Sequence, residues 1–202
     1  MARDSPLGRG ISAVDRAASR HVLALRPSPD FVVRPALASD VGRLGRVRTA
    51  SWQTAYGSIL PEAELERLDP ARATARFRRV INARSQSLLV VHRPSQPVFG
   101  YAWAGPQKDR SLGFAGEVYE LYLHPAEQGR GGGKQLLSAM LWRLAERTLW
   151  PTVIWVLADN PARHFYEACG GRQVLAGSVM VAGKRLPRLG FSWDNFLPLP
   201  VF

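Results

Sequence analysis

A glycine-rich segment is the first part of the chain whose composition points to chemistry. Gln128-Gly-Arg-Gly-Gly-Gly-Lys134 places four glycines and two cationic side chains within seven residues. Glycine lets successive backbone N–H groups converge on one point, and the N-terminus of a helix adds a partial positive charge. A turn of this kind binds phosphate where it leads into a helix. The segment therefore predicts a site for a nucleotide or a pyrophosphate.

Two common phosphate-binding motifs do not fit this segment. A Walker A loop ends in Lys followed by Ser or Thr, whereas Lys134 is followed by Gln135. The dinucleotide fingerprint needs three glycines in the G-x-G-x-x-G register within a βαβ unit, and neither feature is present. Because a surface turn could also hold four glycines, the meaning of the segment depends on the elements around it.

Strand patterns lie on both sides of the glycine segment. Apolar, β-branched and aromatic runs between turn residues predict strands near 31–35, 87–92, 98–103, 117–123 and 152–156, and a hairpin over 172–193. The strand at 117–123 ends just before Gln128. The phosphate-binding turn would therefore follow a strand.

Predicted helices fill the gaps between these strands. Apolar residues recur at helical spacing, and the starts are marked by capping pairs, proline or glycine, at Ser39-Asp40, Pro61, Ala71, Gly133 and Asn160-Pro161. Pro70 is expected to close the second helix before the third begins. The order of elements describes one mixed sheet with helices packed on it, an α/β (α+β) fold.

The N-terminal residues, the apolar runs and the cysteine content indicate how the chain is organised. Residues 1–30 have only a weak apolar pattern and are predicted to be a flexible extension of a single domain at 31–202. No apolar run approaches the roughly 20 residues that span a bilayer, and arginines interrupt any N-terminal signal. A single cysteine, Cys169, excludes an internal disulfide framework. We therefore expect a cytoplasmic protein without a membrane partner.

In this context the chain resembles the GNAT superfamily of N-acetyltransferases. Its pyrophosphate loop, Q/R-x-x-G-x-G/A after the fourth strand, corresponds to Gln128-x-x-Gly131-x-Gly133. The resemblance covers about residues 31–193, and further matching segments are 51–56, 59–62, 120–125, 155–162 and 165–167. It implies a mixed, mostly antiparallel sheet of about six to seven strands flanked by helices, with a splay between the fourth and fifth strands.

The resemblance also implies acetyl-CoA as the co-substrate. The pantetheine arm would pair with the backbone of residues 121–123, and the pyrophosphate would lie on the glycine segment. The implied binding residues are Leu121, Tyr122, Leu123, Gln128, Gly129, Arg130, Gly131, Gly132, Gly133, Lys134 and Asn160. No metal is predicted, because the four histidines lack the spacing of metal ligands.

Acetyl transfer needs a neutral amine, a donor for the oxyanion and an acid for the leaving thiolate. By resemblance, Tyr166 is the expected acid, since a phenol can protonate a thiolate. A backbone N–H near Leu121 to Leu123 would stabilise the oxyanion. Glu120 is the first candidate for the base that takes the amine proton, directly or through water, and Glu117 is the second. An ordinary salt-bridged glutamate remains the alternative for both.

Two departures from the family pattern affect these expectations. The family usually has seven steps from its Asn to the acid Tyr, whereas Asn160 and Tyr166 are six apart. Either one residue is missing before the helix or Asp159 takes the usual Asn position, and Asn160 could serve only as a helix cap. The family's Gly-Phe after this helix is Gly170-Gly171 here, which removes a packing aromatic. Cys169 is expected to be a buried, inert thiol.

The acceptor is predicted to be a small-molecule or peptide amine. Candidates for lining its pocket are the aromatic residues Trp52, Tyr56, Trp103, Tyr119 and Tyr122. The excess of arginine in residues 43–84 disfavours a polycationic acceptor and favours an acidic, neutral or RNA-linked one. A homodimer is left open.

Two other functions stay open at this point. The basic composition would suit an acetyltransferase toxin acting on aminoacyl-tRNA, whose binding would weaken steeply with salt. The altered spacing before Tyr166 would suit a non-catalytic acyl-CoA-binding regulatory module. A protein that only binds nucleic acid is the least supported, since no helix-turn-helix, zinc finger or stacking platform is present.

Overall fold

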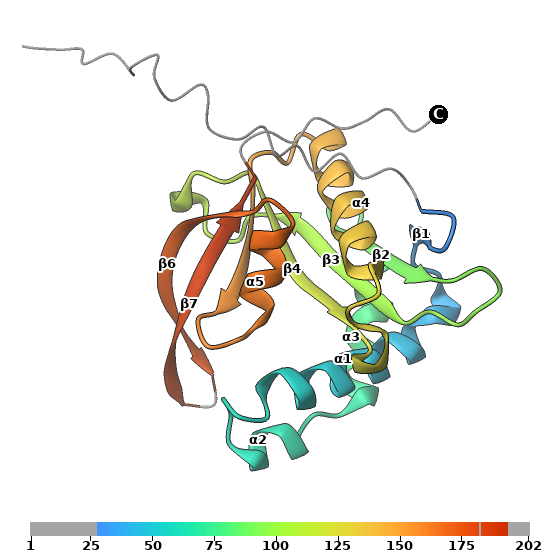
Figure 1. The fold of residues 1–202 in the computed structure, drawn as a ribbon, viewed down its shortest axis with the longest axis horizontal. Coiled ribbons are helices and arrows are strands. Elements are labelled where there is room, and N and C mark those ends of the chain that lie inside the picture. The colour runs from blue at the N-terminus through green and yellow to red at the C-terminus, as the bar shows by residue number, and fades with distance from the viewer. Residues whose placement is uncertain (1–27, 182, 194–202) are drawn as a thin grey trace, which may run out of the picture.

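Seven strands form one sheet in the computed structural model, which describes residues 28–181 and 183–193 (Figure 1). The strands are β1 (Val32–Pro35), β2 (Ser87–His92), β3 (Gly100–Pro106), β4 (Gly116–Leu123), β5 (Thr152–Leu157), β6 (Arg172–Val181) and β7 (Lys184–Ser192). Their order across the sheet is β1-β2-β3-β4-β5-β7-β6, with β4 and β5 as the parallel pair. This confirms the predicted mixed, mostly antiparallel sheet. Most of the predicted extension at 1–30 and the last nine residues of the chain lie outside the described residues.

Helices cover both faces of the sheet. They are α1 (Val41–Tyr56), α2 (Glu62–Glu66), α3 (Pro70–Val80), α4 (Gly132–Glu146) and α5 (Ala162–Ala168), with short 3₁₀ turns η2 (Ala38–Asp40), η3 (Arg110–Leu112) and η4 (Pro125–Glu127). Figure 1 shows α4 and α5 in front of the sheet and α1 and α3 behind it. Within the described part of the chain, no helix combines the length and apolar character needed to cross a membrane.

Each face of the sheet buries its own apolar cluster. One cluster lies between the sheet and helices α4 and α5. It contains the α4 residues Leu136, Met140 and Leu144 and the β7 residue Phe191, all fully buried, with the inward side chains of β2 to β5. On the opposite face, α1 and α3 bury Leu44 and other side chains against β2 and β3, with Phe77 packed on Tyr101. The two clusters fix β4 between them, and β4 carries the candidate site residues Glu120, Leu121, Tyr122 and Leu123.

Three helix starts differ slightly from those predicted. Asp40 precedes α1, but its carboxylate does not cap that helix; it accepts from the Leu37 N–H at 2.7 Å and pairs with Arg34 at 2.8 Å. Pro61 is the N-cap of α2 and not its first helical residue. Pro70 is the first residue of α3, so it opens this helix and does not merely end the one before. The N-cap is Asp69, which accepts from the Ala71 N–H at 2.7 Å.

Strands β4 and β5 separate soon after they meet. Only three residue pairs join them, from Gly116–Thr152 to Val118–Ile154, although β4 continues to Leu123 and β5 to Leu157. Beyond the last pair, β4 keeps its partner β3 and β5 keeps its partner β7. This is the predicted splay, and it leaves one backbone edge of β4 without a strand partner.

A β-bulge lies at the start of the splay. Val118 pairs with Ala104 and Glu120 pairs with the adjacent Trp103, so Tyr119 is one residue more than β3 can match. Such a bulge interrupts the alternation of faces. Tyr119 and Glu120 therefore both face α1 and α3, where Tyr119 packs against Trp103.

Candidate active site

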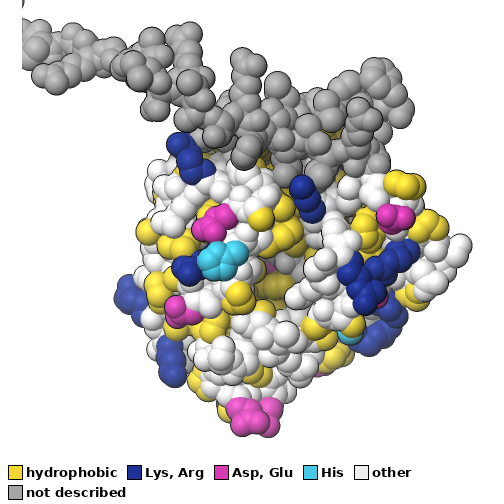
Figure 2. All heavy atoms as spheres, in the orientation of Figure 1, with side chains coloured by type: hydrophobic (Ala, Val, Ile, Leu, Met, Phe, Trp, Pro, Cys, Tyr) yellow, Lys and Arg dark blue, Asp and Glu magenta, His cyan; other side chains and the backbone are white. Residues whose placement is uncertain are grey.

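A cavity of about 750 Å³ occupies the space that the splay opens. Figure 2 shows the molecule hollowed at this place, with hydrophobic side chains on the floor of the hollow. The end of α1, the free edge of β4, the glycine segment, β5 and α5 all contribute to its wall. The predicted site residues on the wall are Glu120, Leu121, Tyr122, Leu123, Gln128, Gly129, Gly131, Gly133, Lys134, Asn160 and Tyr166.

The glycine segment adopts a conformation that glycine permits. Gly129 and Gly131 have φ angles of +73° and +91°, in the left-handed region. Gly131 is the N-cap of α4, and its carbonyl accepts from the N–H groups of Lys134 and Gln135 at 3.1 and 3.3 Å. The N–H groups of Gly132 and Gly133, which come before these two donors, have no helical carbonyl within reach, so they are available to an anion in the cavity.

The free edge of β4 presents backbone groups to the same cavity. Along an antiparallel strand, backbone groups two residues apart point to the same side. The carbonyl of Leu123 points away from β3, because it accepts from Ser51 Oγ at 2.7 Å and from Gln128 Nε2 at 3.3 Å. The N–H and C=O of Leu121 therefore lie on this free edge, where an extended ligand could pair with them.

Tyr166 reaches the cavity from α5. Its side chain is 5% exposed and packs against Phe165, Phe191 and Trp193. Within residues 28–181 and 183–193, its hydroxyl has no hydrogen-bond partner, although it lines the cavity. Burial raises the pKa of Tyr166 well above the usual value near 10, so the phenol stays protonated at neutral pH.

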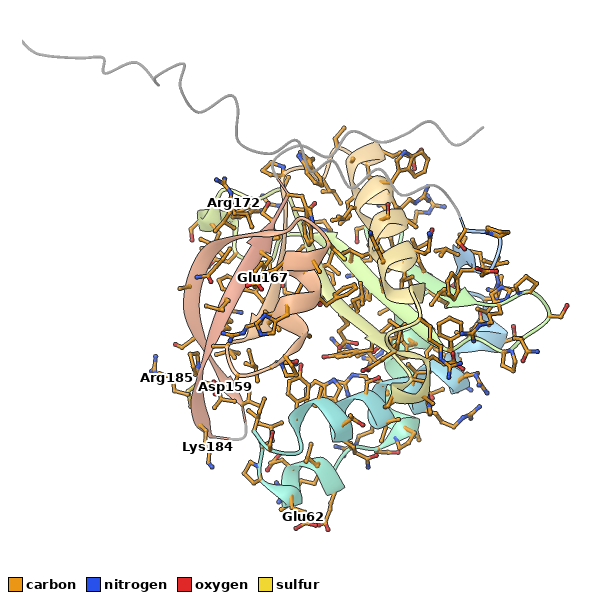
Figure 3. The ribbon with its side chains drawn as sticks, viewed as in Figure 1. Glu62, Asp159, Glu167, Arg172, Lys184 and Arg185 are labelled. Atoms are coloured by element: carbon orange, nitrogen blue, oxygen red, sulfur yellow. The ribbon has the colours of Figure 1, made fainter. Side chains whose placement is uncertain are left out.

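Two further tyrosines join α1 to β4 at the cavity wall. The hydroxyls of Tyr56 and Tyr122 lie 3.2 Å apart. Burial raises the pKa of Tyr56, although the side chains of Tyr122 and Asn160 oppose this rise. Asn160 is buried, and its Oδ1 accepts from the Ala162 N–H at 2.9 Å; the N-cap of α5 is Pro161, so Asn160 supports the start of this helix from one residue earlier than an N-cap would. Asp159 is exposed beside the β6–β7 hairpin (Figure 3), so Asn160 is the residue on the cavity wall.

Glu120 is the centre of an ionic network. Its Oε1 lies 3.4 Å from Arg48 Nε and 3.1 Å from an Arg76 guanidinium nitrogen, and its Oε2 accepts from the Tyr101 hydroxyl at 2.7 Å. The side chain is 8% exposed. Because a carboxylate has about four acceptor sites, these three donors leave one site on Oε2. The carboxylate ties α1 and α3 to the sheet, and Glu120 is one of the residues on the cavity wall.

Some predicted residues lie away from the cavity wall. The Arg130 side chain is largely exposed near Glu127, and Gly132 packs against the Phe99 ring. Of the five aromatic candidates for the acceptor pocket, Tyr56, Tyr119 and Tyr122 line the cavity. Trp52 and Trp103 instead lie beneath the guanidinium groups of Arg48 and Arg76. Trp103 is buried, because it faces the helix layer and not the splay.

Several residues of the site were not predicted. Ser51 holds the end of β4, while Arg48, Arg76 and Tyr101 hold Glu120. The spacing of Ser51 could have indicated its role. It follows Leu44 by seven positions and Val47 by four, so it is a polar residue on the apolar face of α1. Nothing in the sequence indicates which arginines of α1 and α3 meet Glu120.

Comparisons with known proteins agree with this arrangement. Residues 84–170, which run from before β2 to the end of α5, match the model of the acetyltransferase (GNAT) domain. The chain is 29% identical over 168 residues to the uncharacterized N-acetyltransferase YuaI of Bacillus subtilis (strain 168). That alignment covers 83% of this chain and 95% of the relative.

Solved structures share the fold at low sequence identity. The PaiA N-acetyltransferase of Thermoplasma acidophilum, in complex with coenzyme A, has a TM-score of 0.60 at 17% identity and covers 78% of this chain and 97% of its own. YncA of Salmonella typhimurium, with acetyl-CoA, has a TM-score of 0.61 at 18% identity and covers 81% and 92%. With its splayed sheet, its glycine turn and these matches, the chain is similar to the GNAT superfamily of N-acetyltransferases, most directly over residues 84–170.

Proposed function

We propose that the chain transfers an acetyl group from acetyl-CoA to a primary amine of a small molecule or peptide, by direct attack in a ternary complex. One observation carries the proposal. The free edge of β4, the N-terminus of α4 and the Tyr166 side chain all meet in the same cavity. These are the groups needed to pair with an extended arm, to hold a pyrophosphate and to protonate a thiolate.

The cavity fits acetyl-CoA along its length. Its volume of about 750 Å³ lies in the range of pockets that hold cofactors. Leu121 and Leu123 offer backbone groups for the pantetheine amides, and the α4 N-terminus with the Lys134 side chain offers donors and charge for the pyrophosphate. The coenzyme A and acetyl-CoA found in PaiA and YncA support this assignment. Acetyl-CoA would supply the activated thioester.

Tyr166 is the proposed acid for the departing thiolate. Its raised pKa keeps the proton on the phenol until the thiolate forms, and its hydroxyl is free to make that contact. The one-residue change in spacing before the helix does not move this side chain out of the cavity. The arrangement therefore favours a working enzyme over a non-catalytic acyl-CoA-binding module.

Glu120 is proposed to accept the proton of the amine through water. Its remaining acceptor site on Oε2 is the route for this transfer, because Oε1 is occupied by Arg48 and Arg76. A backbone N–H near Leu121 would stabilise the oxyanion. Glu117 pairs with Val153 in the part of β4 that is still joined to β5, so it is further from the free edge at Leu121 than Glu120 is.

The proposal assigns no covalent role to cysteine. Cys169 lines the cavity, but burial raises the pKa of its thiol to about 11, so a thiolate is rare at neutral pH. An amine bound beside the thioester can then attack it without a covalent intermediate.

The first test replaces a glycine of the phosphate turn. Gly131→Glu places a side chain at a φ of +91° and adds a negative charge where the pyrophosphate is proposed to lie. We expect calorimetric titration to show acetyl-CoA binding weakened tenfold or more, about 1.4 kcal/mol or more, because strain and like-charge repulsion add. Free-thiol release should then be measured with panels of amines, peptides and aminoacyl-tRNA.

Gly113→Glu is the matched control for this test. Gly113 has a φ of +75°, and a Cβ there meets nothing within 4 Å, so the substitution brings the same kind of strain outside the phosphate turn. It should leave acetyl-CoA binding intact. Equal losses in the two variants, or no acetyl-CoA binding by the unchanged protein, would contradict the proposed binding site. Thiol release with aminoacyl-tRNA alone would replace the small-amine proposal by the toxin-type activity.

A further inference from the structure

Two cationic side chains beside the start of the splay are paired with no acidic residue among those that the structure describes. The Arg188 guanidinium lies 3.9 Å from the centroid of the Trp155 ring, and the Lys108 ammonium lies 4.0 Å from that of Tyr119. Neither cation forms a salt bridge or a side-chain hydrogen bond with any residue that the structure describes, and Arg188 Nε is buried. Both charges are therefore available to a bound anion.

Gln107 adds an uncharged donor to these cations. Its side chain is 6% exposed, and its Oε1 accepts from the backbone N–H groups of Lys108 and Asp109 at 2.6 and 3.4 Å. This leaves Nε2 as the free end of the amide. It is buried and has no hydrogen-bond partner in the described part of the chain. A buried N–H donor without an acceptor is unfavourable, so a ligand oxygen would relieve this cost.

The acidic residues nearby do not neutralise the pair. Asp109 Oδ1 accepts from the N–H and hydroxyl of Ser111 at 3.1 and 2.6 Å. Glu117 Oε2 lies 3.3 Å from the Lys108 backbone N–H. Burial raises the pKa of Glu117, while the charges of Lys108 and Arg188 act against the rise. Glu117 is thus near both cations without being paired to either.

The position of this cluster separates it from the phosphate turn. Tyr119 and Trp155 line the cavity and directly follow the last paired residues, Val118 and Ile154. The glycine segment lies at the other end of β4, beyond Leu123. The cations pack on the rings of these two wall residues, at the end of β4 away from the proposed pyrophosphate site, and are not themselves among the residues that line the cavity.

We infer that the acceptor amine carries a carboxylate, which Arg188, Lys108 and Gln107 Nε2 bind where β4 and β5 separate. This inference rests on the proposed acetyl transfer and names the class of its acceptor. Guanidinium matches the two oxygens of a carboxylate, and an amide N–H adds a third bond. Since Glu117 lies near both cations without being paired to either, its negative charge opposes a dianionic phosphate more than a monoanionic carboxylate. The amine at the other end of the acceptor then reaches the thioester beside Leu121.

Pairs of carboxylates and carboxamides test the inference. The probes are α-amino acids, ω-amino acids and dipeptides, each compared with its own amide in the thiol-release assay. We expect the carboxylates to have a KM at least tenfold below that of their amides. Arg188→Gln should raise the carboxylate KM by about 10- to 100-fold, the range of a lost charge-assisted bond, and leave the amide KM and the KM for acetyl-CoA unchanged. Lys108→Gln should act in the same direction.

Arg185→Gln is the matched control on the same strand. Arg185 is exposed at the tip of the β6–β7 hairpin, as Figure 3 shows, and its substitution should change neither series. Amides accepted as well as carboxylates, or Arg188→Gln raising both KM values equally, would overturn the inference while acetyl transfer stands.

Calorimetry separates this inference from the proposed function. The same carboxylates are titrated into the protein with coenzyme A present, and we expect Arg188→Gln to weaken their binding tenfold or more. Carboxylate binding without thiol release would count against acetyl transfer but support the anion site. Absence of carboxylate binding, with some uncharged amine acetylated, would leave acetyl transfer standing and reject the anion site.

Discussion

Tyr166→Phe should lower kcat by about 10²- to 10³-fold, the range for loss of a general acid. Phe keeps the ring packed against Phe165, Phe191 and Trp193, so only the hydroxyl is lost. Because that hydroxyl has no hydrogen-bond partner among the described residues, the free energy of unfolding should change by less than about 0.5 kcal/mol. The KM for acetyl-CoA should stay within about threefold. Steady-state thiol release and a melting curve measure both effects.

The pH profile adds a second reading of the same residue. An acid works only while protonated, and the raised pKa of Tyr166 keeps it protonated above pH 10. We therefore expect kcat to rise with pH as the amine loses its proton and not to fall between pH 8 and 10. The Phe variant should keep the rising limb at a lower level. A variant that turns over within threefold of the unchanged enzyme would show that Tyr166 is not the acid.

Glu120→Gln should lower both stability and turnover. Gln can still accept from Tyr101, but it leaves Arg48 without a negative partner in a site where that side chain is 16% exposed. Breaking a buried ion pair costs about 3–5 kcal/mol, and we expect about 2 kcal/mol, because Arg76 is 40% exposed and reaches solvent. If the carboxylate also receives the amine proton, kcat should fall about 10- to 100-fold at pH 7. That loss should shrink at high pH, where the amine is already neutral.

Arg76→Met separates the two roles of Glu120. It removes one ion pair on Oε1 and keeps the carboxylate and the apolar contact with Trp103. Its stability should fall, with kcat within threefold of the unchanged enzyme. Equal kcat losses in the two variants, or a pH-independent loss in Glu120→Gln, would assign Glu120 to positioning alone. Chemical unfolding with thiol release at two pH values decides between these outcomes.

Most of the fold could be predicted because its signals are local. Alternating and apolar runs gave strands within a few residues of those observed, with β2 matching at both ends. The helix starts at Asn160-Pro161 and after the glycine segment follow from capping and glycine conformations, which depend on neighbours along the chain. The splay came from the family resemblance, since no pattern of residues states where two parallel strands part.

The parts of the site that could not be predicted are long-range. Glu120 is separated by 72 and 44 positions from its partners Arg48 and Arg76, and many other arginines compete for it in the sequence. The bulge at Tyr119 depends on pairing with β3. Alternation along β4 alone therefore predicts that Tyr119 and Glu120 face opposite sides of the sheet, whereas both face α1 and α3. Hydrogen-bond partners across the sheet require the folded register, which composition and spacing do not contain.

The short contact between β4 and β5 makes the sheet mechanically two plates. One plate holds β1 to β4, the other holds β5, β7 and β6, and three pairs of residues form the hinge line between them. Bending of the sheet should concentrate on this line, where the fewest residue pairs join neighbouring strands, and the apolar cluster beneath α4, which spans both plates, opposes it. A molecule bound in the gap contacts both plates at once and so resists this bending. The rigidity of the sheet then depends partly on whether a ligand occupies the gap between β4 and β5.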